Sequence, residues 1–514
     1  MKINVRLLGI EAGGKPIVVM KNETAEDLGI RSLDRVRVSY SERMTIAIVN
    51  VASNFPQNAL GIYDEVRLGL GVKDGEEVDI RPAEKPESLR FLQDKIDGHR
   101  LSSSAIRAII QDVIEHHLSD VELASFITSL GIRGLSMEEA EAFTRSMVET
   151  GEIIKWEKER IFDKHSIGGV PGDKTTLVVV PIVASAGLTI PKTSSRAITS
   201  PAGTADRVET LCPVDLNVEE IREVVSKTNG CIVWGGALDL SPADDLFINI
   251  EYPLSIDPLL LASIMSKKKA IGSNNVLIDI PLGGGAKVKT LEESQSLAMD
   301  FIELGRRLDI HVECAITSGE QPIGYAVGPA LEAREALQTL SGKGARDLKE
   351  KATNLAGIIL EMAGIGDGKG GADRLIRSGK AERKLREIVS AQGGDAEIKP
   401  EDIKIGNKHE TVTADQLGRV TRISNAAIAQ IAREAGAPKD KGAGVLLKVK
   451  LGDKVSKGES LFDIYAERSW KMEAARTLAK SIQPIRVDKR TEWKVLIDRI
   501  PMRITPEKPF VLER

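Results

Sequence analysis

The chain has 514 residues, of which 42% are hydrophobic and 28% charged. This composition excludes an intrinsically disordered chain, and the length predicts roughly three or four domains. The formal net charge is -4, and positive and negative residues are interspersed without a strongly basic block. Nucleic acid is therefore not expected as the main partner, whereas a small anionic ligand is compatible with local lysines and arginines.

The first ten residues, MKINVRLLGI, contain no long apolar core, so we expect no secretory signal. We also expect no transmembrane helix, because no stretch of about 18 residues is apolar and free of charge. Cys212, Cys231 and Cys314 lack the CxxC spacing that is typical of zinc sites and redox pairs. Together these features predict a cytoplasmic protein without a metal site, an organic cofactor or a membrane partner.

Residues 1–84 are predicted to form short strands joined by turns, and they contain an internal repeat. The segment LGIRSLDRVRV, which begins at Leu28, returns 42 residues later as LGVKDGEEVDI, which begins at Leu70. Each copy has a turn followed by alternating apolar and polar residues, the pattern of a half-buried strand. The two halves indicate a small pseudo-symmetric β-barrel, with two ordinary hairpins as the alternative. The segment RPAEKPES that follows is predicted to be a linker.

Residues 88–155 are predicted to be helical. The segment SSAIRAIIQDVIEHHL spaces its isoleucines and valine as on one face of a helix. Two further helices are expected to begin near Ser119 and Ser136, because each serine is followed three residues later by a glutamate, as in a capping box. The adjacent His116 and His117 are predicted to be solvated helix residues rather than ligands.

From about residue 156 to residue 420, apolar segments alternate with amphipathic ones. We expect strands at TTLVVVPIVASAGL, CIVWGG, NVLIDIPLG and IHVECAITS, and helices at NVEEIREVVSKT and SQSLAMDFIELGRRL. Continuously apolar strands between helices are typical of a mostly parallel sheet covered on both faces. Residues 421–514 combine a helix, NAAIAQIAREAGA, with a β-rich segment. The predicted fold is therefore a multidomain α/β protein with a β-barrel, a helical domain, an α/β domain and a C-terminal α+β domain.

The segment DKHSIGGVPGDKTT, residues 163–176, combines glycines with lysines and hydroxyl residues. It is not a Walker loop, because Asp173 separates Gly172 from the following Lys-Thr pair, and its glycines do not follow the GxGxxG spacing. Adjacent glycines nevertheless let backbone N–H groups approach an anion closely. A cradle for an anion and a strand-to-helix turn without a ligand are about equally compatible with this composition.

A second donor-rich segment, KTSSRAITSPAGTADRVE, covers residues 192–209 and follows the first after one apolar segment. Two such loops that flank one strand-helix unit converge at one end of an open α/β sheet, where ligands bind. The pair of loops therefore favours an oxyanion site over two solvated loops.

Five blocks of sequence resemble the thymidine and pyrimidine-nucleoside phosphorylase family in order and spacing. They are the two donor-rich loops, SIMSKKKAIGSNNVLIDIPLGGGAK, TSGEQPIGYAVGPALEA and AGVLLKVKLGDKVSKGESL, within residues 88–490. The N-terminal extension, the inserted Pro171 and SSRAITSPAGTAD are most similar to the archaeal AMP phosphorylases. The resemblance implies a transferase of nucleotide degradation and salvage that converts AMP and inorganic phosphate to adenine and ribose 1,5-bisphosphate. It implies CMP and UMP as further substrates, and phosphate as co-substrate without another cofactor.

The resemblance also implies an architecture. Residues 88–155, completed by a segment near 243–272, would form the helical domain, and residues 156–242 and 273–420 the α/β domain. The active site would lie in a cleft between the two domains, and closure of this cleft would exclude water. The family is at least dimeric, usually through the helical domain, so a homodimer or a larger homo-oligomer is expected.

Roles for individual residues follow from the same resemblance. The phosphate-side donors would be Lys164, Ser166, Thr176, Ser194 and Thr204. The nucleotide-binding residues would be Gly169, Ser195, Arg196, Ala197, Ile198, Thr199, Ser200, Thr204, Ser263 and Lys287. A 5′-phosphate additionally requires a cation, for which Arg196 and Lys287 are the best candidates, and the forked guanidinium favours Arg196.

The departing base needs a proton, and Asp257 matches the proton donor proposed for the family. A carboxyl group performs this step near neutral pH when its surroundings raise its pKa. On the residues alone, Asp257 and Pro258 ahead of LLLASIMSKK also predict a helix N-cap with proline at the first helical position. His165 is the second catalytic candidate, for contact with the ribose or base. Lys267 and Lys268 could meet the base or the 5′-phosphate, or lie on a solvated helix face.

Pyrimidine-specific relatives carry an arginine before this helix, whereas INIEYPLSID has none. This difference argues against strict pyrimidine specificity. The alternatives are a thymidine or pyrimidine-nucleoside phosphorylase, the related anthranilate phosphoribosyltransferase class, whose glycine pattern fits less well, and a non-catalytic nucleotide-binding protein on the same scaffold.

Overall fold

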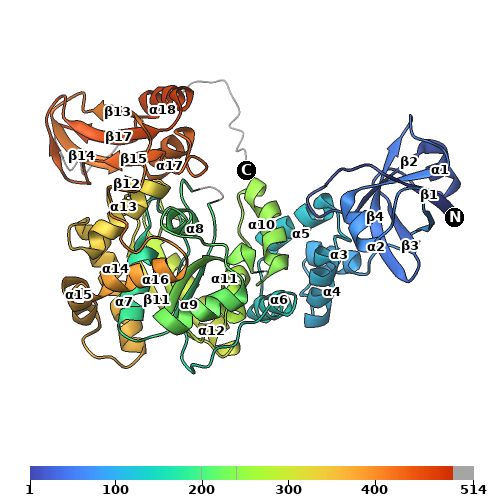
Figure 1. Ribbon diagram of the computed structural model, residues 1–514, viewed down its shortest axis with the longest axis horizontal. Coiled ribbons are helices and arrows are strands. Elements are labelled where there is room, and N and C mark those ends of the chain that lie inside the picture. Colours follow the sequence, from blue (N-terminus) through green and yellow to red (C-terminus); the bar gives the residue numbers. More distant parts are fainter. Residues whose placement is uncertain (198–199, 239, 490–514) are drawn as a thin grey trace, which may run out of the picture.

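The computed structural model describes residues 1–197, 200–238 and 240–489. Figure 1 shows the N-terminal barrel at one end of the molecule, helices that join it to the α/β domain, and the C-terminal domain stacked on the α/β domain. This is the multidomain α/β architecture that the sequence predicts. Within the described ranges, every helix is too short or too polar to span a bilayer.

Six strands close the N-terminal barrel in the order β1-β5-β2-β4-β3-β6. They are β1 (Lys2–Leu7), β2 (Ile17–Lys21), β3 (Arg35–Tyr40), β4 (Arg43–Ala52), β5 (Ala59–Ile62) and β6 (Glu77–Pro82). The repeat places β3 and β6 side by side and antiparallel, with Val38 opposite Ile80. Both side chains are fully buried in the barrel core, as are Val36 and Val78. The predicted barrel is confirmed.

The repeat also contains two short helices that the sequence does not predict, α1 (Asn22–Asp27) and α2 (Asp64–Leu70). Gly29 and Gly71 follow them with φ values of 67° and 69°. Glycine adopts this left-handed conformation at least cost, and it commonly ends a helix in this way. The repeated Leu-Gly pairs are therefore helix ends, and helices of 6 and 7 residues are too short to show an apolar periodicity.

The helical bundle is built from two separate stretches of chain. It contains α3 (Ser88–Ile96), α4 (Ser103–Ile114), α5 (Asp120–Arg133) and α6 (Met137–Glu149), together with α10 (Pro242–Leu254) and α11 (Leu260–Ala270). Ser119 and Ser136 begin α5 and α6 with complete capping boxes, as predicted. Phe247 and Leu259 from the second stretch are buried in the same core as Phe126. The residue limits of the domains stay a prediction.

The barrel and the bundle are joined by ion pairs at the start of α5. Arg35 on β3 pairs with Glu122 and donates to the carbonyl oxygen of His117. A second pair joins Lys15 of the barrel to Asp120 at 2.6 Å. The guanidinium of Arg35 is largely buried, so the contact restrains the barrel more strongly than exposed pairs would.

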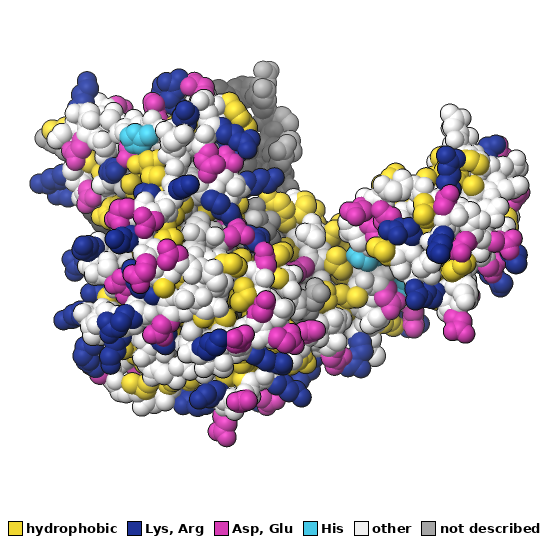
Figure 2. Space-filling model, viewed as in Figure 1, with side chains coloured by type: hydrophobic (Ala, Val, Ile, Leu, Met, Phe, Trp, Pro, Cys, Tyr) yellow, Lys and Arg dark blue, Asp and Glu magenta, His cyan; other side chains and the backbone are white. Residues whose placement is uncertain are grey.

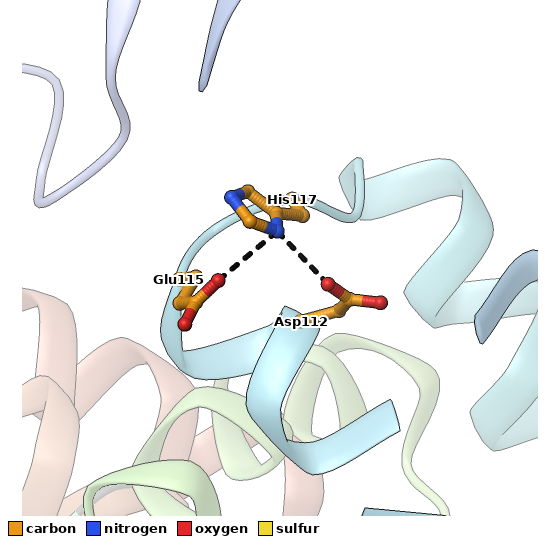
Figure 3. A group of neighbouring side chains, drawn as sticks. All are labelled: Asp112, Glu115 and His117. Carbon is orange, nitrogen blue, oxygen red and sulfur yellow. Dashed lines mark hydrogen bonds and ion pairs between the residues drawn. The ribbon is translucent and has the colours of Figure 1, made fainter. Parts of the chain in front are cut away.

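His116 and His117 lie near this contact between the barrel and the bundle. Nδ1 of His117 lies 2.9 Å from Asp112 Oδ1 and 3.3 Å from Glu115 Oε2 (Figure 3). The prediction that both histidines are solvated helix residues is wrong, because α4 ends at Ile114 and His116 adopts a left-handed φ of 55°. Both rings are partly buried. The three side chains of Figure 3 stabilise the end of α4, and we assign them a structural role.

Five parallel strands are described in the α/β domain: β7 (Phe162–Ser166), β8 (Ile190–Ser194), β9 (Gly230–Trp234), β10 (Asn275–Leu282) and β11 (His311–Ser318). The order is β11-β10-β7, and β8 pairs with β9. A parallel bridge between Ile161 and Thr189 connects β7 to β8. The parallel sheet is confirmed, and the carboxyl ends of its strands lie at one edge. The connections include α7 (Thr175–Ser185), α8 (Thr204–Val208), α9 (Val218–Thr228), the 3-10 turn η1 (Gly235–Ala237) and α12 (Leu291–Arg307).

The prediction of a strand at TTLVVVPIVASAGL is wrong, because this segment forms α7. Its residues from Thr175 to Ala184 are all buried, and the helix packs against α14 (Arg346–Met362) and α16 (Lys380–Ala391). A helix that is covered on every side has no polar face, so its sequence shows no helical period. Its β-branched residues then imitate a buried strand.

The remaining elements form the outer layer of the α/β domain and the C-terminal domain. The outer layer adds α13 (Pro329–Leu340) and α15 (Gly368–Arg377). The C-terminal domain contains β12 (Ala326–Val327), β13 (Lys408–Thr413), β14 (Gly418–Ile423), β15 (Gly444–Leu447), β16 (Lys454–Val455), β17 (Ser460–Ala466) and β18 (Ile485–Asp488), with α17 (Asn425–Glu434) and α18 (Ser469–Ile482). Its two sheets have the orders β12-β15-β17-β13 and β16-β14-β18. The predicted α+β domain is confirmed.

Candidate active site

The two donor-rich loops meet at the carboxyl edge of the sheet. β7 and β8 are parallel neighbours, and they end at Ser166 and Ser194. Thr204 is the first residue of α8, and the next backbone N–H donates to the carbonyl oxygen of Ser195 at 3.3 Å. Ser166, Ser194 and Thr204 are therefore brought to the same edge, which is the convergence that the sequence predicts.

The glycine-rich loop connects β7 to α7 and packs on the loop after β10. Gly168, Gly169 and Gly172 all have positive φ values, of 84°, 90° and 76°. A Cβ atom at Gly169 would lie 2.7 Å from the backbone nitrogen of Lys287, so glycine is required for this close approach. Thr176 lies in the first turn of α7, where the N–H groups of Thr175 and Leu177 already donate to Asp173 and to the carbonyl oxygen of Lys174. The segment is thus a strand-to-helix turn that also carries hydroxyl groups as candidate anion donors.

Lys174, the residue that resembles a Walker lysine, is completely buried. Its buried ammonium group pairs with Glu335 at 2.6 Å and donates to the carbonyl oxygens of Ile323 and Ala326. These contacts tie the glycine-rich loop to the segment that leads into β12. Lys174 is therefore a structural residue, which agrees with the failed Walker spacing.

A buried network of charges lies beneath the phosphate-side residues. Lys164, 1% exposed, has its ammonium 3.5 Å from Asp279 on β10, and Lys351 of α14 pairs with the same carboxylate at 2.9 Å. Lys351 also reaches Asp173 in the glycine-rich loop at 3.4 Å. Burial raises the pKa of Asp173, but the neighbouring Lys351 and Lys164 outweigh it and lower this pKa well below its usual range. The network orients Lys164 with few alternative positions.

A second buried group lies beside it, around Asp163. This carboxylate pairs with Lys268 of α11 at 2.6 Å and with Lys192 of β8 at 3.4 Å. Burial, followed by the positive charges of Lys268, Lys192 and Lys164, lowers the pKa of His165 well below its usual value. The imidazole is therefore neutral at pH 7. Lys268 is buried in an ion pair, so the interpretation of Lys268 as a solvated residue is wrong.

Asp206 on α8 holds the second donor-rich loop. Its Oδ2 accepts hydrogen bonds from the backbone N–H groups of Ala197 at 2.7 Å and Gly203 at 2.9 Å. Gly203 packs so tightly that an added Cβ would lie 2.5 Å from the carbonyl oxygen of Ser195. Ser195 and Ser200 are exposed at this loop. Two further predicted contacts, Ile198 and Thr199, lie outside the described residues.

Arg196 is engaged by carboxylates of its own domain. Its guanidinium donates to both oxygens of Glu209, at 2.7 and 2.9 Å, and to Asp215 at 3.3 Å. It also lies over the ring of Trp234, 4.8 Å from the centroid. The hydrogen bonds that Arg196 donates to Glu209, opposed by burial, raise the pKa of Arg196 above its usual value. An incoming phosphate would therefore have to compete with these carboxylates for its donors.

The opposite side of the site comes from the turn between α10 and α11. Asp257 lies in this turn, and its Oδ2 is 2.8 Å from the ammonium of Lys287 on the loop after β10. The alternative prediction of Asp257 as an N-cap is wrong, because α11 begins at Leu260 and Leu259 is its N-cap residue. The buried carboxyl group of Glu251 accepts the Leu259 N–H at 3.2 Å, so this helix end does not depend on the Asp257 side chain.

The carboxyl groups of α10 organise α11. Asp244 accepts a hydrogen bond from Ser263 Oγ at 3.0 Å and pairs with Lys267 at 2.6 Å. Burial lowers the pKa of Lys267, but the charges of Asp244 and Asp245 outweigh it and raise this pKa. Burial, with Asp257 and Asp244 adding to it, raises the pKa of Glu251 to about 8. Ser263 and Lys267 thus face α10.

The sequence reasoning did not single out Asp163, Asp279, Lys192, Asp244 or Glu251. A signal for Asp279 does exist, because it is a lone charge within the continuously apolar strand NVLIDIPLG. Such a charge is buried at high cost unless it is paired, so it indicates a functional or structural ion pair. The partner lysine on α14 carries no comparable signal, because lysines are common on helix surfaces.

Comparisons with known proteins agree with this arrangement. Residues 158–382 match the α/β domain of a glycosyl transferase family, and residues 89–151 match the helical bundle domain of a glycosyl transferase family. Residues 419–486 match the pyrimidine nucleoside phosphorylase C-terminal domain. The fold is also similar to a crystal structure of anthranilate phosphoribosyltransferase from Thermus thermophilus, with a TM-score of 0.50 and 18% identity over 59% of this chain and 98% of that chain. This likeness concerns the fold.

Curated relatives match almost the whole chain. An AMP phosphorylase from Thermofilum pendens is 46% identical over 514 residues, which is 100% of both chains. AMP phosphorylases from Thermococcus kodakarensis and Methanocaldococcus jannaschii are 51% and 50% identical over 494 residues, 95% of this chain and 98% and 97% of theirs. The glycine-rich loop, the second donor-rich loop and the α10–α11 turn thus occur in a chain that belongs to the AMP phosphorylase family.

Proposed function

We propose that the protein cleaves AMP with inorganic phosphate and releases adenine and ribose 1,5-bisphosphate, with CMP and UMP as further substrates. The observation that carries this proposal is the convergence of Ser166, Ser194 and Thr204 at one edge of the sheet, above the buried Lys164. Asp257 and Lys287 lie on the side where a nucleotide would enter. The full-length similarity to AMP phosphorylases supports the choice of substrate.

The phosphate side would hold the nucleophile. Lys164 supplies a fixed positive charge, and the hydroxyl groups of Ser166, Thr176 and Thr204 donate to the phosphate oxygens. Ser194 Oγ donates to the carbonyl oxygen of Val233 at 3.0 Å, so Ser194 would have to exchange this partner for the phosphate. An oxygen of the bound phosphate attacks C1′ as the glycosidic bond breaks, and the electron pair of that bond moves to the base. Donors that are held in place before the reaction stabilise this charge without reorganisation.

The base side would supply a proton to the leaving group. We assign this step to Asp257, because the neutral imidazole of His165 has no proton to spare as an acid at pH 7. His165 is instead suited to a hydrogen bond with the ribose or base, as one of its ring nitrogens donates and the other accepts. Ser263 would contact the nucleotide from α11.

The 5′-phosphate would bind Lys287. The sequence favours Arg196 for this role, but its guanidinium is already bonded to Glu209 and Asp215. Lys287 is 45% exposed, and its ammonium is paired with Asp257, which is itself half-exposed. Its backbone also touches Gly169, so it lies next to the proposed phosphate side.

Homo-oligomerisation stays part of the proposal. Figure 2 shows hydrophobic side chains on the surface between the barrel and the body of the molecule. Exposed apolar residues of α5 and α10 include Val121, Ile132, Tyr252 and Leu254, which are 74%, 75%, 41% and 42% exposed. Exposed apolar surface of this kind is typical of contact surfaces between proteins.

Product identification tests the function. The protein is incubated with AMP and phosphate, and the products are separated by chromatography and mass. Adenine with ribose 1,5-bisphosphate is the expected result. Faster turnover of thymidine than of AMP would favour a nucleoside phosphorylase, and AMP binding without adenine release in saturating phosphate would favour a nucleotide-binding protein.

A further inference from the structure

The ion pair between Lys287 and Asp257 joins two residues that would need to be apart during the reaction. Lys287 lies on the loop after β10 in the α/β domain, whereas Asp257 lies in the α10–α11 turn of the helical bundle. Their charged atoms are 2.8 Å apart. A carboxylate in this pair has no proton to give to a base, and an ammonium in this pair is not available to a 5′-phosphate.

Both side chains of the pair are exposed, so Lys287 can easily exchange Asp257 for another negatively charged partner. The two side chains are 45% and 40% exposed, and exposed pairs contribute only about 0–1 kcal/mol. A hydrogen bond to a charged group such as a phosphate dianion contributes about 1.5–3 kcal/mol. A nucleotide phosphate that reaches Lys287 therefore competes successfully with Asp257.

The surroundings of the two side chains hold their backbones in place. Glu251 fixes the end of the turn through the Leu259 N–H, and Gly169 packs against the backbone of Lys287. Other charged groups on α10 and α11 include Glu251, Asp244, Asp245 and Lys267. The Asp244 and Lys267 charges are paired with each other. Exchange thus requires movement of the Lys287 side chain rather than of either domain.

We propose that the Lys287–Asp257 pair makes the contact between Asp257 and the base conditional on a 5′-phosphate: the phosphate takes Lys287 away from Asp257, and the carboxyl group of Asp257 is then free to face the departing base. This inference rests on the proposed function. According to this inference, nucleotides are selected over nucleosides because only a nucleotide carries the phosphate that replaces Asp257 as the partner of Lys287.

The proton balance closes over one turnover. The departing base gains one proton at a ring nitrogen as the C1′–N bond breaks, and Asp257 is the group that delivers it. The attacking hydrogen phosphate becomes an ester and releases one proton. Lys287 returns to Asp257 once the bisphosphate has left.

A nucleoside reaches the same base and ribose contacts but leaves the pair intact. Substitution Lys287→Met removes the ammonium from both of its partners. We expect kcat/KM for AMP to fall about tenfold to a hundredfold, as the charged bond to the phosphate is lost. We expect kcat for adenosine to rise about fivefold, which corresponds to a released pair of about 1 kcal/mol. A residue that only binds the phosphate would leave adenosine turnover unchanged.

Lys289→Met is the matched control, because Lys289 is an exposed lysine on the same segment, and its backbone N–H donates to Glu293. Turnover of AMP and of adenosine by the wild type, K289M and K287M is measured at saturating phosphate. The expected result is a rise with adenosine in K287M and wild-type rates in K289M. Wild-type adenosine turnover in K287M, with the wild type active on AMP, overturns the inference alone. A wild type that releases no adenine from AMP overturns both proposals.

Discussion

The proposed phosphate side and the proposed base side of the site differ in how their charges are held. On the phosphate side, Lys164 and Asp279 are almost completely buried, and each charge has at least one fixed partner. On the base side, Asp257 and Lys287 form an exposed pair in which both partners are free to change. The first arrangement suits a small anion that is bound in the same way in every turnover. The second suits groups that must change partner within a turnover.

An enzyme of this kind binds two phosphate groups, inorganic phosphate and the 5′-phosphate of the nucleotide. The difference shows how the burial of the donors affects the binding of each. Buried donors cost little reorganisation when the transition state forms, so they favour the reacting phosphate. Exposed donors bind a group more weakly, but they allow it to enter and leave. Substitutions on the two sides should therefore change different kinetic constants.

Lys164→Met should have the largest effect. It removes the buried cation of the phosphate side, and we expect kcat/KM for phosphate to fall about a thousandfold. Initial rates at varied phosphate concentration measure this loss, with Lys158→Met, an exposed lysine before β7, as the control. Thermal unfolding of K164M shows whether the protein is folded. A folded K164M with wild-type use of phosphate would contradict the assignment of Lys164.

Asp257→Asn should have the next largest effect, which we expect on kcat for AMP rather than on kcat/KM for phosphate. An amide cannot supply the acidic proton, so we expect kcat for AMP to fall about a hundredfold, while KM for phosphate stays near the wild-type value. Steady-state rates at varied AMP and phosphate separate the two constants. A large rise in KM for phosphate would mean that the two sides are not independent.

Gly169→Ala tests the contact that joins the sides. An added Cβ would lie 2.7 Å from the Lys287 backbone nitrogen, and we expect a loss of about tenfold in kcat/KM for AMP from a strain of about 1–3 kcal/mol. Gly168→Ala is a matched control, because its φ is similarly positive but no atom lies within 4 Å of the position that its methyl group would take. Equal losses in the two variants would assign the effect to backbone strain rather than to the contact.

Glu251→Gln should have the smallest effect on catalysis, and the size of its effect on stability depends on pH. Burial, with Asp257 and Asp244 adding to it, raises the pKa of Glu251 from 4.5 to about 8 in the folded protein. The folded state then binds more protons than the unfolded state between these values, so the wild type loses stability as the pH rises through this window. Glutamine does not titrate. We expect E251Q to gain stability relative to the wild type from pH 5 to pH 8, with no further gain above.

Melting temperatures at pH 5, 7 and 9 measure the effect, with the exposed Glu152→Gln as the control. A difference between E251Q and the wild type that does not change with pH would contradict the raised pKa.

The sequence predicts those elements whose signal is local. Ser119 and Ser136 begin helices through capping boxes that are visible in the sequence, and NVLIDIPLG is a buried strand with flanking turn residues. It does not predict α7, because a helix that is buried on all sides has lost the polar face that reveals a helix.

The candidate site was predictable to a similar degree. Each of its two loops carries its donors within one short segment, so the sequence locates them. The ion pairs of Lys164, Arg196 and Lys287 join segments that are not adjacent in the chain, and their partners follow from the fold rather than from spacing. The sequence therefore favours Arg196 for the 5′-phosphate. In the structure the guanidinium of Arg196 is already paired with carboxylates, so we assign the 5′-phosphate to Lys287.

The repeat in the barrel has a consequence for how this domain can be altered. In the order β1-β5-β2-β4-β3-β6, each strand of the first half of the barrel, β1 to β3, lies between strands of the second half, β4 to β6. Neither half forms a sheet by itself. A fragment that contains only one half would leave the edges of all its strands unpaired. Deletion or transplantation of the barrel is therefore workable with both copies together, and a cut between β3 and β4 destroys the domain rather than halving it.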